Sequence, residues 1–225
     1  MTIEEQGGGQ PLGLSTERPP REPVLRAPWP ALLLAGSFLV LYGLQDLAGS
    51  DALVARFGFS PAELAEGQAG GLVTALFIHG GWAHAFLNAL GALAFGAPIA
   101  WLFGKGIGAA GAFLLFFLLC GGLASLGYAA LHWGQPYMLV VASGGVSGFM
   151  GAVSRLMGPG PGLARFTSRP VLTMAGAWIF VNLVVALVGL GAVAGDAPIA
   201  WEAHLIGYAV GLLLMGPALR LLRRI

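Results

Sequence analysis

The sequence predicts an all-α integral membrane protein with six transmembrane helices, and three observations favour this fold class. Hydrophobic residues make up 57% of the 225 residues and charged residues only 9%, unlike the balance in soluble domains. The mean hydropathy is +0.81. Most of the length falls into apolar stretches of about 18 to 25 residues, each long enough to cross a hydrocarbon core of roughly 30 Å. One membrane domain at residues 28–220 accounts for nearly the whole chain.

Residues 1–27 precede the first apolar stretch and differ from it in composition. They mix Gly, Pro and both charge signs without periodicity, which leaves too little apolar surface to offset chain entropy, so we expect a disordered tail. A signal peptide would need a short basic start, an apolar core and a small-residue cleavage site, and this stretch has no such pattern. Residues 221–225 form a short basic C-terminus.

The apolar stretches give the predicted spans in order: 28–45, 82–103, 107–131, 138–157, 171–193 and 199–219. A tight GKGI turn joins the second and third spans, whereas a long loop at residues 46–81 separates the first and second. That loop contains SPAEL, an N-cap serine followed by proline and then Glu63, which predicts a short helix at the membrane interface.

Charged residues predict the orientation, because cytoplasmic loops retain Lys and Arg. Ten of the eleven basic residues fall on one side of the spans, so both termini are expected in the cytoplasm (N-in/C-in). The net charge of +1 hides this uneven distribution and gives no argument for a nucleic acid partner. A bacterial inner (plasma) membrane is the simplest location for so compact a chain. The ten residues are Arg18, Arg21, Arg26, Lys105, Arg155, Arg165, Arg169, Arg220, Arg223 and Arg224.

Polar residues recur at one depth in the three spans that run from outside to inside. His84 and Asn88, Ser143 and Ser147, and His204 each lie within the first two turns. Polar side chains are costly in hydrocarbon unless they are paired, so the set predicts a shared water-accessible cavity that opens outward. His84 and Asn88 are four residues apart and share a helix face; their spacing fits a site and simple interhelical hydrogen bonding equally well.

Glycines predict which spans meet at this depth. Gly207 and Gly211 follow His204 on one side of the last span, and Gly144 and Gly148 offer a matching surface on the fourth. Small residues four apart let two backbones approach closely, although glycines alone favour a simple packing role. If these surfaces meet, the serines come within reach of His204, and an imidazole can then take the hydroxyl proton.

No carboxylate lies at the right depth to complete a triad. Glu202 is two residues from His204 and points elsewhere, and Asp196 falls in a loop, so the residues indicate a Ser–His dyad. The single cysteine, Cys120, suits core packing. No cluster of His, Cys or carboxylate residues has metal-ligand spacing, so neither a metal nor an organic cofactor is expected.

Three stretches resemble motifs of one family, the rhomboid intramembrane serine proteases. LVTALFIHGGWAHAFLNALGALAFG resembles the second-helix region, VVASGGVSGFMGA the serine motif and AHLIGYAVG the histidine helix, in family order over roughly residues 65–215. The resemblance implies a six-helix rhomboid-like bundle with a serine nucleophile and His204 as base. It also implies an oxyanion site formed by the serine N–H together with His84 and Asn88.

Two serines compete for the role of nucleophile. The short family pattern G-x-S-G fits Ser147 literally, whereas the longer pattern and the position near the top of the span favour Ser143. With Ser143, Val141 stands where the family has glycine, and a valine there would crowd the site. We take Ser143 as the first choice and Ser147 as the alternative.

The sequence therefore predicts an intramembrane serine endopeptidase that cleaves transmembrane segments of other membrane proteins near the outer leaflet. The alternative is a catalytically weak or inactive rhomboid-like protein that binds or remodels membrane proteins, which Val141 supports. A small transporter fits less well, because the polar set lies near the outer surface and the sequence has no visible inverted repeat. The oligomeric state is left open.

Overall fold

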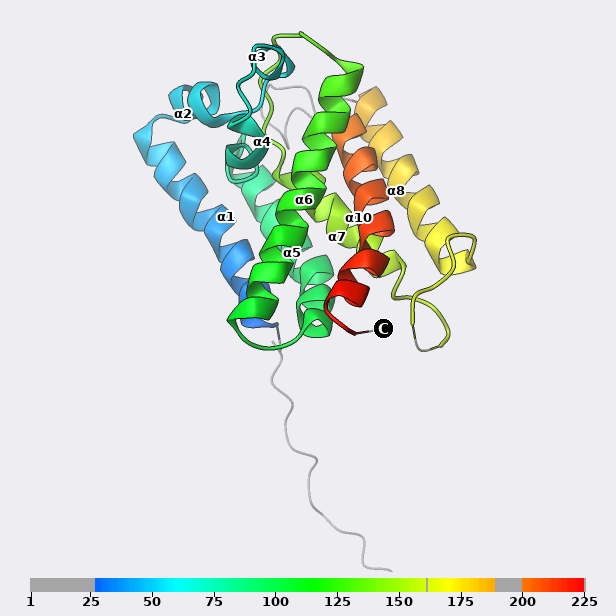
Figure 1. Cartoon of the computed structure of the whole chain (residues 1–225). Helices are drawn as coiled ribbons and strands as arrows, with labels where there is room; N and C mark the ends of the chain where they lie inside the picture. The colour runs from blue at the N-terminus through cyan, green and yellow to red at the C-terminus, as the bar shows by residue number, and fades with distance from the viewer. Residues whose placement is uncertain (1–26, 161, 189–199, 225) are drawn as a thin grey trace, which may run out of the picture.

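A computed structural model describes residues 27–160, 162–188 and 200–224, and in these ranges the chain forms a bundle of helices (Figure 1). Five of the described helices are long and apolar enough to span a membrane, which makes the protein a multi-pass integral membrane protein. The tail predicted for residues 1–27 lies outside the described residues except for its last residue. The five long helices are α1 (Trp29–Ala48), α5 (Trp82–Phe103), α6 (Ile107–Leu131), α8 (Arg169–Val188) and α10 (Trp201–Leu221).

The fourth predicted span differs from the other five. It forms α7 (Ala142–Ser154), whose 13 residues are fewer than the 20 predicted at 138–157. At 1.5 Å per residue α7 is about 20 Å long, against the roughly 30 Å of a hydrocarbon core. The helix starts late because the preceding residues bond elsewhere. Leu139 exchanges two backbone hydrogen bonds of 2.9 Å with Phe59, and the Val141 N–H donates to the Ala75 carbonyl at 3.0 Å.

The loop between α1 and α5 folds over the end of the bundle at which α7 begins. It contains three short helices, α2 (Ser50–Phe57), α3 (Pro61–Ala65) and α4 (Gly71–Thr74), which Figure 1 shows at the top of the molecule. The SPAEL segment forms α3 with Pro61 in its first turn, so the short helix predicted there is confirmed. Together with the Phe59–Leu139 pair, this loop satisfies backbone groups that precede α7.

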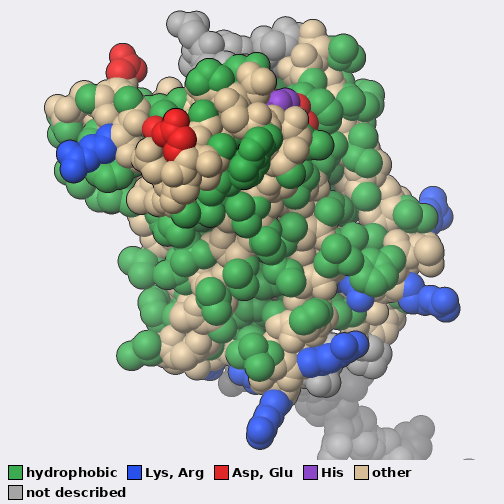
Figure 2. Space-filling model, turned by 45° about the horizontal axis from the view of Figure 1, so that its top comes forward, with side chains coloured by type: hydrophobic (Ala, Val, Ile, Leu, Met, Phe, Trp, Pro, Cys, Tyr) green, Lys and Arg blue, Asp and Glu red, His purple; other side chains and the backbone are tan. Residues whose placement is uncertain are grey.

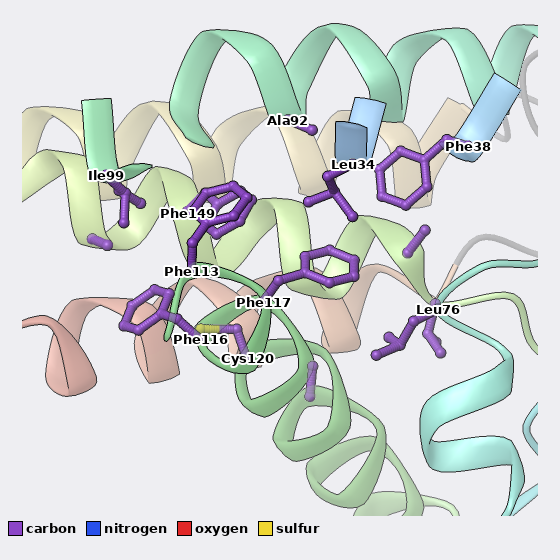
Figure 3. Close-up of a cluster of buried hydrophobic side chains, with 14 of the residues drawn as sticks. Leu34, Phe38, Leu76, Ala92, Ile99, Phe113, Phe116, Phe117, Cys120 and Phe149 are labelled. Carbon is purple, nitrogen blue, oxygen red and sulfur yellow. The ribbon is translucent and has the colours of Figure 1, made fainter. Parts of the chain in front are cut away.

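Aromatic side chains fill the space around α7 (Figure 3). The Phe149 ring of α7 stacks on Phe113 of α6, with centroids 4.9 Å apart, and packs against Phe117 at 5.7 Å. Phe117 in turn contacts Phe38 of α1 at 5.7 Å. Ten of the 13 residues of α7 are buried, so this short helix is the centre of the bundle rather than part of its lipid-facing surface.

The surface divides into an apolar side wall and two charged ends (Figure 2). Hydrophobic side chains cover the side of the molecule in that view, while Lys and Arg gather mainly at the lower end and Asp and Glu at the upper end. Five apolar helices with charge confined to their ends suit a protein that lies across a bilayer.

Candidate active site

Glycines bring α7 and α10 into backbone contact. A Cβ added to Gly207 would overlap the carbonyl oxygen of Gly144, and one added to Gly211 would overlap that of Gly148. Only glycine at these positions lets the two helices approach so closely. This α7–α10 seam, defined by Gly144, Gly148, Gly207 and Gly211, fixes the register between the first turns of the two helices.

The seam places Ser143 beside His204. Ser143 Oγ lies 2.7 Å from His204 Nε2, a hydrogen bond between the second residue of α7 and the fourth of α10. Ser147 is 2% exposed, and its hydroxyl donates to the Ser143 backbone carbonyl at 2.6 Å. Of the two candidate serines, Ser143 therefore has its hydroxyl on the imidazole, while Ser147 uses its own to bond the helix one turn back.

The other ring nitrogen of His204 has a partner that the sequence analysis missed. His204 Nδ1 lies 2.8 Å from Asn182 Oδ1, and Asn182 is 2% exposed on α8. The dyad predicted from sequence thus has a third polar group behind it. The sequence did contain an indication of this residue, because Asn182 is the one amide in an otherwise apolar span. If the helix starts near Arg169, Asn182 lies about 20 Å along it, close to the depth of the other polar residues.

Three hydrogen-bond donors face the same space as Ser143. Asn88 is 4% exposed and its Nδ2 donates to no group among the described residues. His84 Nδ1 accepts the Gly80 N–H at 3.4 Å, which leaves the opposite nitrogen of that ring as a donor. The Ser143 N–H belongs to the first turn of α7, where backbone donors have no intrahelical acceptor. Unpaired buried donors are rare, so their convergence suits a ligand that carries negative charge.

These groups line a cavity of about 1130 Å³ between α5, α7, α8 and α10, with α2 at its rim. Ser143, His204, His84, Asn88 and Asn182 all contribute to its wall, and the rest of the lining is mainly apolar. The cavity exists because α7 is short: the long helices continue past its first residue and leave room above it. A few polar groups at the base of a large apolar cavity are typical of a binding site.

Val141 also lines this cavity, at 1% exposure, while its backbone N–H bonds Ala75. Its side chain forms part of the wall directly before α7. We expected a valine at this position to crowd the site, but the cavity beside Val141 still has a volume of about 1130 Å³. The oxyanion donors described here do not include the Val141 N–H, because that group already has an acceptor.

The remaining polar residues near the site have other partners. Glu202 points away from His204 and contacts His132, with an oxygen–nitrogen distance of 3.3 Å. His79 is fully buried in the turn before α5, where Gln45 bonds both its backbone groups at 2.6 and 3.1 Å. Burial, and then the proximity of His84, lower the pKa of His79 to about 3. His79 is therefore neutral and structural at physiological pH.

A comparison with protein families identifies one match. The model of the Rhomboid domain matches residues 66–220, more than half of the chain, and the matched region includes Ser143, Asn182 and His204. None of the curated proteins matches the chain.

Proposed function

Because the chain belongs to the rhomboid family, we propose that it is an intramembrane serine endopeptidase that cleaves transmembrane segments of other membrane proteins. One observation carries the proposal. Ser143 Oγ and His204 Nε2 are 2.7 Å apart at the wall of a large apolar cavity, within the distance at which an imidazole takes a hydroxyl proton.

In the proposed mechanism Ser143 Oγ attacks the scissile carbonyl carbon while its proton passes to His204 Nε2. The C–N bond then breaks, and Nε2 returns the proton to the leaving amine. A water molecule entering through the cavity gives a proton to Nε2 and attacks the carbonyl carbon of the acyl-enzyme ester. The bond between that carbon and Ser143 Oγ then breaks, which frees the new carboxyl group, and Nε2 returns its proton to Oγ and restores Ser143. No metal or organic cofactor takes part in these steps.

The oxyanion of the tetrahedral intermediate would lie among three donors: the Ser143 N–H, Asn88 Nδ2 and the His84 ring N–H. The amide of Asn88 is the strongest support, because Nδ2 has no acceptor among the described residues and such a buried donor is ready for charge that develops during reaction. One such donor lowers the barrier by about 3 kcal/mol. Removing the Asn88 amide should therefore slow acylation more than it weakens substrate binding.

The topology proposed with this function has six spans. In addition to the five long helices, α7 would be a span, the fourth in chain order, which is shortened at its outer end and surrounded by the other helices. Both termini would be cytoplasmic and the cavity would open to the outer side of a bacterial inner membrane, since basic residues gather at the opposite end. The bilayer is then one partner, and a transmembrane protein substrate that unwinds near the outer leaflet is the other.

The test is covalent labelling of the purified protein with a fluorophosphonate, which reacts with activated serines. We expect the wild type and Ser147→Ala to be labelled, and Ser143→Ala and His204→Ala to remain unlabelled. Ser147→Ala is the matched control, because it removes a hydroxyl one turn away on the same helix, and among the described residues that hydroxyl bonds the Ser143 backbone carbonyl. Mass spectrometry of the labelled peptide should place the adduct on Ser143.

Two results would contradict the proposal. Labelling lost only in Ser147→Ala would make Ser147 the nucleophile. A folded wild type without any label would favour a rhomboid-like protein that binds or remodels membrane segments without cleaving them. The buried Val141 beside the nucleophile is the feature that supports this second function.

A further inference from the structure

Asn182 is placed where it can control the imidazole of His204. Its Oδ1 lies 2.8 Å from His204 Nδ1, and its Nδ2 donates to the Trp178 carbonyl at 2.9 Å, one turn earlier on α8. We propose that Asn182 is a positioning residue that holds His204 in the tautomer and orientation needed to take the proton of Ser143. This inference rests on the proposed function, and it turns the dyad into a Ser–His–Asn arrangement.

The Trp178 carbonyl determines which way the Asn182 amide faces. A backbone carbonyl can only accept, so the group that meets it must be the NH₂ end of the amide. The oxygen end then faces His204. The orientation therefore follows from the Trp178 carbonyl, because reversing the amide would place Oδ1, an acceptor, against that carbonyl oxygen.

The orientation of the amide in turn determines where the proton of the imidazole lies. Because Asn182 Oδ1 can only accept, His204 Nδ1 must carry the hydrogen in this contact. Nε2 then has the lone pair, and Nε2 is the nitrogen 2.7 Å from Ser143 Oγ. In the opposite tautomer Nε2 would carry the hydrogen and the lone pair would lie on Nδ1, away from Ser143. An orienting group therefore matters in such sites.

An amide suits this position better than a carboxylate. Asn182 is 2% exposed on a helix that is apolar at neighbouring positions, and an unpaired ion there would be costly. The amide satisfies both of its ends at a lower desolvation cost, one on a backbone carbonyl and one on the imidazole. It orients His204 without adding a formal charge.

The same contact connects the imidazole to the position of α8. Among the described residues, two side-chain hydrogen bonds join α8 to α10, and both end on His204: Asn182 to the ring, and the Trp178 Nε1–H to the backbone carbonyl at 3.5 Å. The Trp178 ring also lies 6.0 Å from the imidazole. Displacing α8 would remove the acceptor from Nδ1, so the activity should require α8 to be docked on α10.

The experiment compares Asn182→Leu and Asn182→Asp with the wild type in fluorophosphonate labelling kinetics. Leucine keeps the branched shape of the side chain and removes the acceptor. The maximal labelling rate should therefore fall about 10- to 100-fold, which is part of the rate enhancement that general base catalysis provides. The reagent concentration for half-maximal rate should not change. A protonated aspartic acid can still donate to Trp178 and accept from Nδ1, so Asn182→Asp should retain most of the rate. Thr173→Val, which removes an exposed hydroxyl from the same helix, is the control and should match the wild type.

A second measurement does not depend on any variant of Asn182. The ¹⁵N shifts of the His204 ring in the wild-type protein, assigned with His204→Gln, report which nitrogen carries the proton. We expect the proton on Nδ1 at neutral pH, and a proton on Nε2 would overturn the proposal even if Asn182→Leu failed to fold. Equal labelling rates for Asn182→Leu and the wild type would overturn it too. A wild type that is never labelled at Ser143 would instead remove the proposed function, so the two failures are distinguishable.

Discussion

Helix α10 meets α7 and α8 in different ways, and these two contacts constrain different aspects of the site. Against α7 it packs backbone to backbone through the glycines of the seam, and a Cβ at Gly207 or Gly211 would overlap a carbonyl oxygen. Against α8 it has the Asn182 and Trp178 hydrogen bonds to His204. Only 11% of the apolar window of α8 is buried, compared with 28–39% in the other four long helices.

The two contacts control two different quantities, the distance between Ser143 and His204 and the orientation of the imidazole. The seam is built from backbone that cannot yield, so it sets how far Ser143 lies from His204. The α8 contact is small and depends on two side chains, and in our proposal it sets how the imidazole is turned. Most of the stability should therefore reside in the seam and the aromatic cluster around α7, and little in α8.

The largest effect should come from breaking the seam with Gly211→Val. The added Cβ would overlap the Gly148 carbonyl, and neither backbone can move without displacing its helix. We expect a loss of at least about 3 kcal/mol in the free energy of unfolding, or no folded protein at all. Denaturant titration in detergent micelles would measure it.

Gly36→Val is the matched control for this substitution. Gly36 lies on α1, and a Cβ added there meets nothing within 4 Å. The control should unfold near the wild-type midpoint, because valine is slightly better than glycine in a helix. Equal stability of Gly211→Val and Gly36→Val would mean that the two backbones are not held as closely as the glycines require.

A smaller effect should distinguish the interior of the bundle from α8. Phe149 is fully buried on α7, whereas Phe180 on α8 is 67% exposed to what would be lipid. Phe149→Ala should cost about 3 kcal/mol of unfolding free energy through the cavity it leaves, and Phe180→Ala less than about 1 kcal/mol. The same micelle titration tests both variants. Equal costs would show that α8 is packed as firmly as α7.

The sequence predicted the parts of this fold that depend on one segment at a time. Hydropathy located the five long helices, since crossing a membrane needs only enough consecutive apolar residues. It placed the start of the fourth span four residues too early, at 138. Residues 139 and 141 are apolar, but they bond Phe59 and Ala75, and such pairing between distant backbones leaves no trace in hydropathy.

The candidate site, like the fold, could be predicted from the sequence only in part. The glycine spacing on two spans pointed to the contact that brings Ser143 to His204, because small residues four apart mark a helix face. The sequence analysis missed Asn182 because this residue lies far from the start of its span, whereas the other polar residues of the site lie within the first two turns of theirs. Its role depends on α8 lying beside α10, and a lone amide in an apolar helix predicts no particular partner.

The smallest expected effect is a gain in stability, and it would sharpen the contrast between the contacts of α10 with α7 and with α8. Gly176 lies within α8, and a Cβ added there meets nothing within 4 Å, so Gly176→Ala has only the helix propensity to change. The expected gain is about 0.5–1 kcal/mol in unfolding free energy, with unchanged fluorophosphonate labelling. If Gly176→Ala stabilises the protein and Gly211→Ala destabilises it, the close approach of the two backbones at the seam, and not the glycine content of the helices, holds the site together. A loss of stability in Gly176→Ala would instead mean that α8 has a close neighbour on this face.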